Sequence, residues 1–198
     1  MYYLADYIID SLPYMLCALP LLALFRFWAV RRMRKRGAKT TFAHELLLGL
    51  FLLLIVALLS QTVIPKFEFG NVPFGFAKDE TDGGINLIPG LIFYDSVAEW
   101  QKLGSPFYFV TNLLGNIIMF APLGFFPPLL FKVMPRKKVL LLAFSFSLFV
   151  ELLQLPQARW TDVDDLWLNT LGGLLGYGLY QLFIKIFPKL KTRFFTTE

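Results

Sequence analysis

The chain has 198 residues, 57% of them hydrophobic, and a mean hydropathy of +0.60, which argues against an ordinary soluble domain with roughly 45–50% apolar residues. Its net charge of +5 comes largely from basic residues beside apolar runs, which indicates orientation in a membrane rather than binding to nucleic acid. The only cysteine, Cys17, excludes an intramolecular disulfide and a cysteine-based metal site.

Five apolar runs are long enough to cross a hydrocarbon core as helices, which takes about 20 residues. They cover residues 7–30, 44–64, 107–131, 139–155 and 166–187. Helices are expected because lipid offers no hydrogen-bond partner to an open backbone. Pro122, Pro127 and Pro128 should kink or end the third helix. The sequence therefore predicts an all-α, polytopic membrane helical bundle with about five transmembrane helices, forming a single integral membrane domain over residues 1–198.

Charge predicts the orientation of this bundle. Basic residues gather at 31–39, 132–138 and 185–193, and acidic residues gather at 6–10, 68–99 and 162–165. With five crossings, the three basic regions lie on one side and the acidic regions on the other. The positive-inside rule then places the N-terminus outside and the C-terminus in the cytoplasm.

The long outer segment between the second and third runs contains a further element. Leu91, Val97, Trp100 and Leu103 recur at roughly helical spacing, with polar residues between them. This pattern predicts an extracytoplasmic amphipathic helix that lies on the membrane surface.

Polar residues recur near the outer ends of the last three runs. Glu151 and Gln154 are three residues apart, so they share a helix face, and Asp162, Asp165 and Asn169 follow one stripe of the fifth helix. Charged groups within hydrocarbon are costly and usually face the protein interior or a watery cavity. We therefore predict an outward-open polar pocket between the last three helices.

Further residues complete this predicted pocket. Asn112 and Asn116 lie four residues apart in the third run, Asn86 comes from the outer segment, and Arg159 precedes the fifth run. The catalytic candidates are Glu151, Asp162 and Asp165, and the ligand-binding candidates are Asn86, Asn112, Asn116, Gln154, Arg159 and Asn169. No metal site or cofactor is assigned.

Glycines explain how these helices could approach one another. Gly172, Gly173 and Gly176 continue the polar stripe inward, and Gly172 and Gly176 have the spacing of a helix-packing motif.

A purely structural reading competes with the pocket. Thr161 and Asp164 resemble a capping box, and acidic residues in a first turn complement the helix dipole. Arg159 could neutralise Glu151 or Asp162, so that the polar groups only tie helices together.

Four stretches of the chain resemble the VanZ-like family, over residues 86–180. They are Asn86-Leu-Ile-Pro, the run from Asn112 through Pro122-Leu-Gly, Glu151-Leu-Leu-Gln, and Arg159 through Asp162-Val-Asp-Asp-Leu-Trp-Leu-Asn169-Thr-Leu-Gly-Gly. The resemblance implies a multi-pass protein of the bacterial plasma membrane. The namesake of the family is associated with low-level resistance to teicoplanin, a glycopeptide antibiotic that binds cell-wall precursors outside the membrane.

These residues are compatible with three functions. The pocket could bind a glycopeptide, a lipid-linked cell-wall precursor or a lipid, and so contribute to teicoplanin resistance or cell-envelope homeostasis. The carboxylates could instead serve an intramembrane enzyme that acts on a lipid or lipid-linked precursor at the outer leaflet. A transporter is the third possibility. The expected partners are membrane lipids and these envelope molecules, not nucleic acid, and the oligomeric state is left open.

Overall fold

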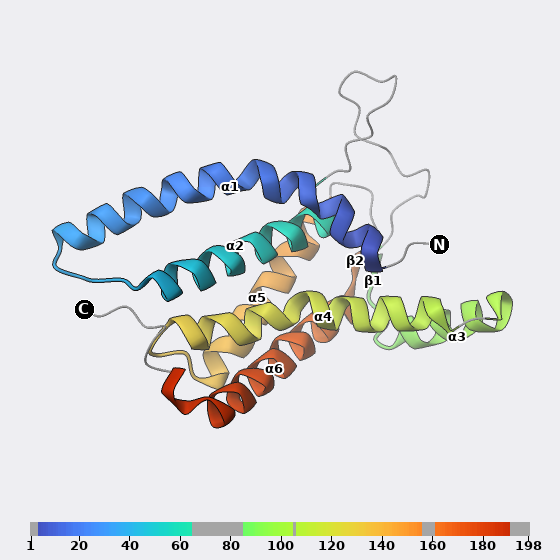
Figure 1. Ribbon diagram of the computed structural model, residues 1–198. Helices are drawn as coiled ribbons and strands as arrows, with labels where there is room; N and C mark the ends of the chain where they lie inside the picture. Colours follow the sequence, from blue (N-terminus) through green and yellow to red (C-terminus); the bar gives the residue numbers. More distant parts are fainter. Residues whose placement is uncertain (1–3, 65–84, 105, 156–160, 191–198) are drawn as a thin grey trace, which may run out of the picture.

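The protein is an all-α bundle, as predicted, in a computed structural model that describes residues 4–64, 85–104, 106–155 and 161–190 (Figure 1). Six helices account for most of these residues: α1 (Leu4–Lys35), α2 (Phe42–Thr62), α3 (Leu91–Leu103), α4 (Phe107–Leu130), α5 (Arg136–Gln154) and α6 (Val163–Ile186). Two short strands, β1 (Ile85–Asn86) and β2 (Thr161–Asp162), and a 3-10 turn, η2 (Pro188–Leu190), complete the described elements.

Each predicted apolar run corresponds to one long helix, and the predicted amphipathic helix corresponds to α3. Three described segments are long and apolar enough to cross a membrane: Ile9–Lys35, Phe42–Thr62 and Leu113–Leu130. The remaining two, α5 and α6, carry more polar residues, including Glu151 and Asn169. The number of five crossings therefore stays a prediction.

Three prolines lie within α4. The helix continues through Pro122 and ends at Leu130, two residues after Pro128. Neighbouring helices and local adjustments allow proline within apolar helices, because they compensate for the backbone hydrogen bond that proline removes.

The long helices run side by side and define two ends of the bundle (Figure 1). We call the end where α6 begins the cluster end, and the end where α1 joins α2 the basic end. In sequence order α1, α2, α4, α5 and α6 alternate in direction, so α4 and α6 both begin toward the cluster end, and the first turns of α4 extend beyond the start of α6. There α3 folds back along the first part of α4.

Apolar side chains from three helices form the centre of the bundle. Leu58 of α2, Phe120 and Leu123 of α4, and Val150 of α5 are all buried and in contact. In contrast, α1 leaves large side chains such as Trp28 exposed. An exposed apolar face of this kind suits contact with lipid, which solvates apolar side chains as well as a protein core does.

Glycines let α6 approach both α4 and α5. A Cβ atom built on Gly176 would lie 2.8 Å from the carbonyl carbon of Ala121 in α4, and closer still to its oxygen. A Cβ atom on Gly172 would meet the backbone of Ile117 in the same helix, and one on Gly173 would lie 2.5 Å from the Cβ of Ala143 in α5. All three glycines are buried, so α6 packs between α4 and α5 with almost no space at these positions.

Candidate functional site

The pairing of β1 with β2 brings together two segments that are far apart in the sequence. The strands are parallel, with Ile85 opposite Thr161 and Asn86 opposite Asp162. The side chain of Asn86 is buried, donates from Nδ2 to Oδ1 of Asp162 over 2.9 Å, and accepts from the backbone N–H of Ile88 over 2.9 Å. The short sheet thus fixes the residues that lead into α3 against the start of α6.

Asp162 caps the N-terminus of α6. Its Oδ1 accepts from the backbone N–H of Asp164 over 2.8 Å, in addition to the amide of Asn86. The capping-box interpretation of Thr161 and Asp164 is therefore wrong. Thr161 Oγ1 has no hydrogen-bond partner among the described residues, and the capping position belongs to Asp162.

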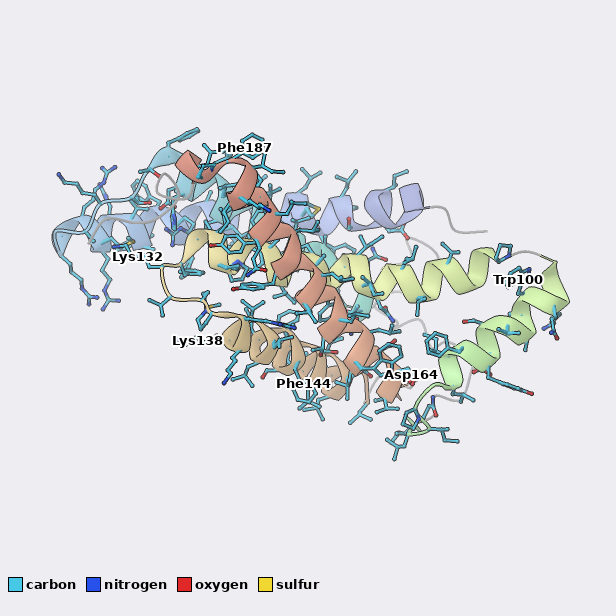
Figure 2. All side chains as sticks on the ribbon, turned by 90° about the horizontal axis from the view of Figure 1, so that it is seen from below. Trp100, Lys132, Lys138, Phe144, Asp164 and Phe187 are labelled. Carbon is cyan, nitrogen blue, oxygen red and sulfur yellow. The ribbon has the colours of Figure 1, made fainter. Side chains whose placement is uncertain are left out.

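Asp164 holds the beginning of α3 instead. Its fully buried carboxylate accepts from the backbone N–H groups of Gly90 and Ile92 over 2.7 and 2.9 Å, and from Nε1 of Trp167 over 2.7 Å. Gly90 is the N-cap of α3 and has a φ of 87°, a conformation that favours glycine. Because Gly90 has no side chain, a carboxylate from α6 supplies the cap and complements the helix dipole. Figure 2 shows Asp164 where these two helices begin.

Two more carboxylates, Glu151 of α5 and Asp165 of α6, are brought close to Asp162. Glu151 is only 3% exposed, and its Oε2 accepts from the backbone N–H of Asp162 over 3.3 Å. Asp165 accepts a hydrogen bond from Nδ2 of Asn116 in α4. The negative charges of Asp162 and Asp165 act on Glu151, so three carboxylates share one region.

A polar pair lies one turn deeper in the bundle. Nδ2 of Asn169 donates to Oγ of Ser147 over 2.9 Å, and both side chains are buried. Oδ1 of Asn169 lacks a hydrogen-bond partner within the described part of the chain. Ser147 was not among the residues predicted from the sequence. It lies four residues before Glu151, so its position on the same face of α5 was the available signal.

Gln154 was predicted to line the pocket between the last three helices, but its side chain bonds to α2. Its Nε2 donates to the backbone carbonyl of Thr62, at the end of α2, over 2.9 Å. It therefore joins α5 to α2, although it shares a helix face with Glu151. Asn112 belongs to α4, but its side chain is outside the described set, and Arg159 lies outside the described residues altogether.

We call the assembled side chains the polar cluster. Its members are Asn86, Asn116, Ser147, Glu151, Asp162, Asp164, Asp165 and Asn169. It is rich in hydrogen-bond acceptors that could receive hydroxyl, amide or ammonium donors. Within the ranges described above, no group of three or more histidine, cysteine, aspartate or glutamate residues is placed to hold a metal ion.

Comparison with known proteins identifies one related family. A family model described as VanZ/LLP1 matches residues 50–184, about two thirds of the chain, and includes every member of the polar cluster. No curated protein and no solved structure gives a significant match.

Proposed function

Because this chain belongs to the VanZ/LLP1 family and is a membrane protein with long apolar helices, we propose that its polar cluster recognises a molecule of the cell envelope. The site faces the outside of a bacterial plasma membrane in this proposal, with the N-terminus outside and the C-terminus in the cytoplasm. The ligand is a glycopeptide such as teicoplanin or a lipid-linked cell-wall precursor. Binding contributes to teicoplanin resistance or to cell-envelope homeostasis.

The distribution of charge supports this orientation. The α1–α2 connection and the α4–α5 connection are both basic and lie at the basic end. The carboxylates of the polar cluster lie at the opposite end of the same helices. Basic residues flank cytoplasmic helix ends in membrane proteins, so the cluster end faces outward.

The convergence of the polar cluster is the observation on which the proposal rests. Side chains from β1, α4, α5 and α6 meet at one end of an apolar bundle. Burial of polar and charged groups opposes folding unless they are paired. An arrangement that only held helices together could use apolar side chains at these positions, as the centre of the bundle does with Phe120 and Val150.

The groups predicted to meet a ligand have distinct roles. Glu151, Asp162 and Asp165 accept from its hydroxyl, amide or ammonium groups, while Asn86, Asn112, Asn116 and Asn169 can both donate and accept. Arg159 offers a planar donor fork to a ligand carboxylate or phosphate. A glycopeptide and a lipid-linked precursor carry both kinds of group, which is why a site of mixed polarity fits them.

The test measures binding to the full chain in lipid nanodiscs. Labelled teicoplanin and a labelled lipid-linked precursor are titrated against wild type, an Arg159→Ala/Asp165→Asn variant and a matched Asp95→Asn control, since Asp95 is an exposed carboxylate of α3. We expect at least about tenfold weaker binding by the double variant, because one hydrogen bond to a charged group contributes about 1.5–3 kcal/mol. Equal binding by all three folded proteins would rule the proposal out.

A second function is supported by the environment of Glu151. A carboxylate has about four acceptor positions, and one hydrogen bond of 3.3 Å is described for this buried group. The carboxylate oxygens of Glu151 therefore have acceptor positions left over, with which they could take a proton from a substrate. This suits a general acid or base that acts at the outer leaflet. Water or the substrate itself would act as the nucleophile. Turnover of a lipid or lipid-linked precursor that Glu151→Gln abolishes, while binding persists, would favour this enzyme over a binding protein.

A further inference from the structure

A partly open cavity lies at the basic end of the bundle, away from the polar cluster. Its volume is about 320 Å³, and it lies between α1, α2 and the residue that follows α4. Most of its lining is apolar and comes from Phe25, Met33, Leu48, Leu52 and Phe131. A lining of this kind suits a flexible hydrocarbon chain.

The charged groups in the cavity wall already neutralise one another. Arg26 of α1 donates from Nε and Nη2 to the two carboxylate oxygens of Glu45 in α2, over 2.9 and 2.8 Å. Thr40 donates to the same carboxylate over 2.6 Å, and His44, the remaining lining residue, is buried beside it. The wall therefore has a fixed polar edge whose ion pair leaves little net charge.

Two exposed cations lie close in the chain to residues of the apolar lining. Arg36 lies in the turn after α1, where its backbone N–H donates to the carbonyl of Met33 over 2.9 Å, so the chain turns back beside the lining residue Met33. Lys132 directly follows Phe131, another lining residue, and both cations are exposed. Figure 2 shows Lys132 at the same end of the bundle as the α1–α2 connection.

We infer that this cavity binds an anionic phospholipid, with one acyl chain against the apolar lining and the phosphate between Arg36 and Lys132. Charge complementarity selects an anionic headgroup. Among the described residues, Glu45 is the acidic residue of the basic end, and Arg26 already pairs with it. Basic pockets between transmembrane helices are suited to anionic lipid headgroups, and an arginine fork matches phosphate geometry.

The test titrates the full chain, in micelles of a neutral detergent, with phosphatidylglycerol and with phosphatidylcholine of the same acyl chains. Native mass spectrometry reports the bound lipid. We expect tighter binding of phosphatidylglycerol and a roughly 30-fold loss of its affinity in an Arg36→Gln/Lys132→Gln variant, since each cation near an anionic lipid contributes about a fivefold effect.

A matched control separates this site from general electrostatic attraction. Lys137→Gln/Lys138→Gln removes the same charge from the basic end, but from α5, which contributes no described lining residue. This variant should retain wild-type affinity for phosphatidylglycerol. Equal losses in the two double variants, or equal binding of the two lipids by wild type, would overturn the inference.

A third variant tests the acyl-chain part of the cavity. Leu52→Trp fills the space beside the apolar lining but leaves Arg36 and Lys132 unchanged. We expect this variant to bind phosphatidylglycerol more weakly than wild type does. Without added lipid it should unfold at the wild-type temperature. Wild-type affinity in this folded variant would show that the headgroup alone is held at the surface, which contradicts the inferred cavity site.

Discussion

The contact between Gly173 of α6 and Ala143 of α5 allows a direct test of how closely these helices pack. A Cβ atom on Gly173 would lie 2.5 Å from the Cβ of Ala143, and its next contact would be the Cα of Ala143 at 3.9 Å. Carbon atoms in ordinary contact are about 3.5–4.0 Å apart. The Gly173→Ala variant therefore requires α5 and α6 to separate by about 1 Å, or one of them to rotate.

The expected cost follows from overpacking, which destabilises a core by about 1–3 kcal/mol. The 2.5 Å approach puts this variant at the upper end of that range. Alanine in a helix recovers up to about 1 kcal/mol relative to glycine, so we expect Gly173→Ala to lower the free energy of unfolding by about 2 kcal/mol. Ala143→Gly removes the one atom that clashes. The double variant should therefore be at least about 1 kcal/mol more stable than the sum of the two single changes predicts.

Reversible unfolding in detergent, followed by circular dichroism, measures these free energies. Gly178→Ala is the matched control on the same helix, because nothing lies within 4 Å of the added Cβ atom, and it should be neutral or stabilising. Two outcomes would refute the reasoning. One is additivity of the Gly173 and Ala143 changes to within about 0.5 kcal/mol, and the other is an equal loss of stability in Gly178→Ala.

Three further predictions concern polar contacts. Asp164→Asn should make the first amides of α3 exchange with solvent at least about tenfold faster, because their charged acceptor is lost. Hydrogen-exchange mass spectrometry measures this rate, and an unchanged rate would contradict the role of Asp164 as the cap of α3. Ser147→Ala should lower the free energy of unfolding by about 1–3 kcal/mol, because Nδ2 of Asn169 loses its acceptor, and adding Asn169→Leu should recover part of that loss. Arg26→Gln leaves Glu45 without its ion pair and should lower the free energy of unfolding by on the order of 1–3 kcal/mol. In the same unfolding experiment, the Arg26→Gln/Glu45→Gln variant should be more stable than Arg26→Gln alone.

The sequence was a good guide to the helices because each long one contains a continuous apolar run. The amphipathic spacing among Leu91, Val97, Trp100 and Leu103 likewise predicted a helix in the stretch where the structure has α3. Helix ends were harder to place. The helical backbone of α1 extends to Lys35, beyond the apolar run that ends at Val30, because arginine and lysine are good helix formers and long enough to place their charges in water.

The sequence was a weaker guide to polar partners, because a shared helix face does not say which neighbour it meets. Glu151 and Gln154 share a face, yet Gln154 bonds to α2 and Glu151 to the start of α6. The pairing of β1 with β2 was missed, since strands of two residues have no periodic pattern. From the sequence, Asp164 resembled part of a capping box at the start of its own helix. Only the structure shows that its carboxylate binds the N–H of Gly90 and so caps α3.

The three aspartates at the start of α6 show how one short motif can position several elements. Neighbouring residues of a helix point about 100° apart, so the carboxylates of Asp164 and Asp165 face different partners. Asp164 binds the first turn of α3 and Asp165 binds Asn116 of α4, while Asp162 caps α6 itself and holds Asn86. The start of α6 thus connects β1 and α3 to the bundle, and the glycines farther along fix the same helix between α4 and α5. A ligand that displaced Asp164 would therefore release the start of α3, whereas one that displaced Asp165 would release Asn116 of α4.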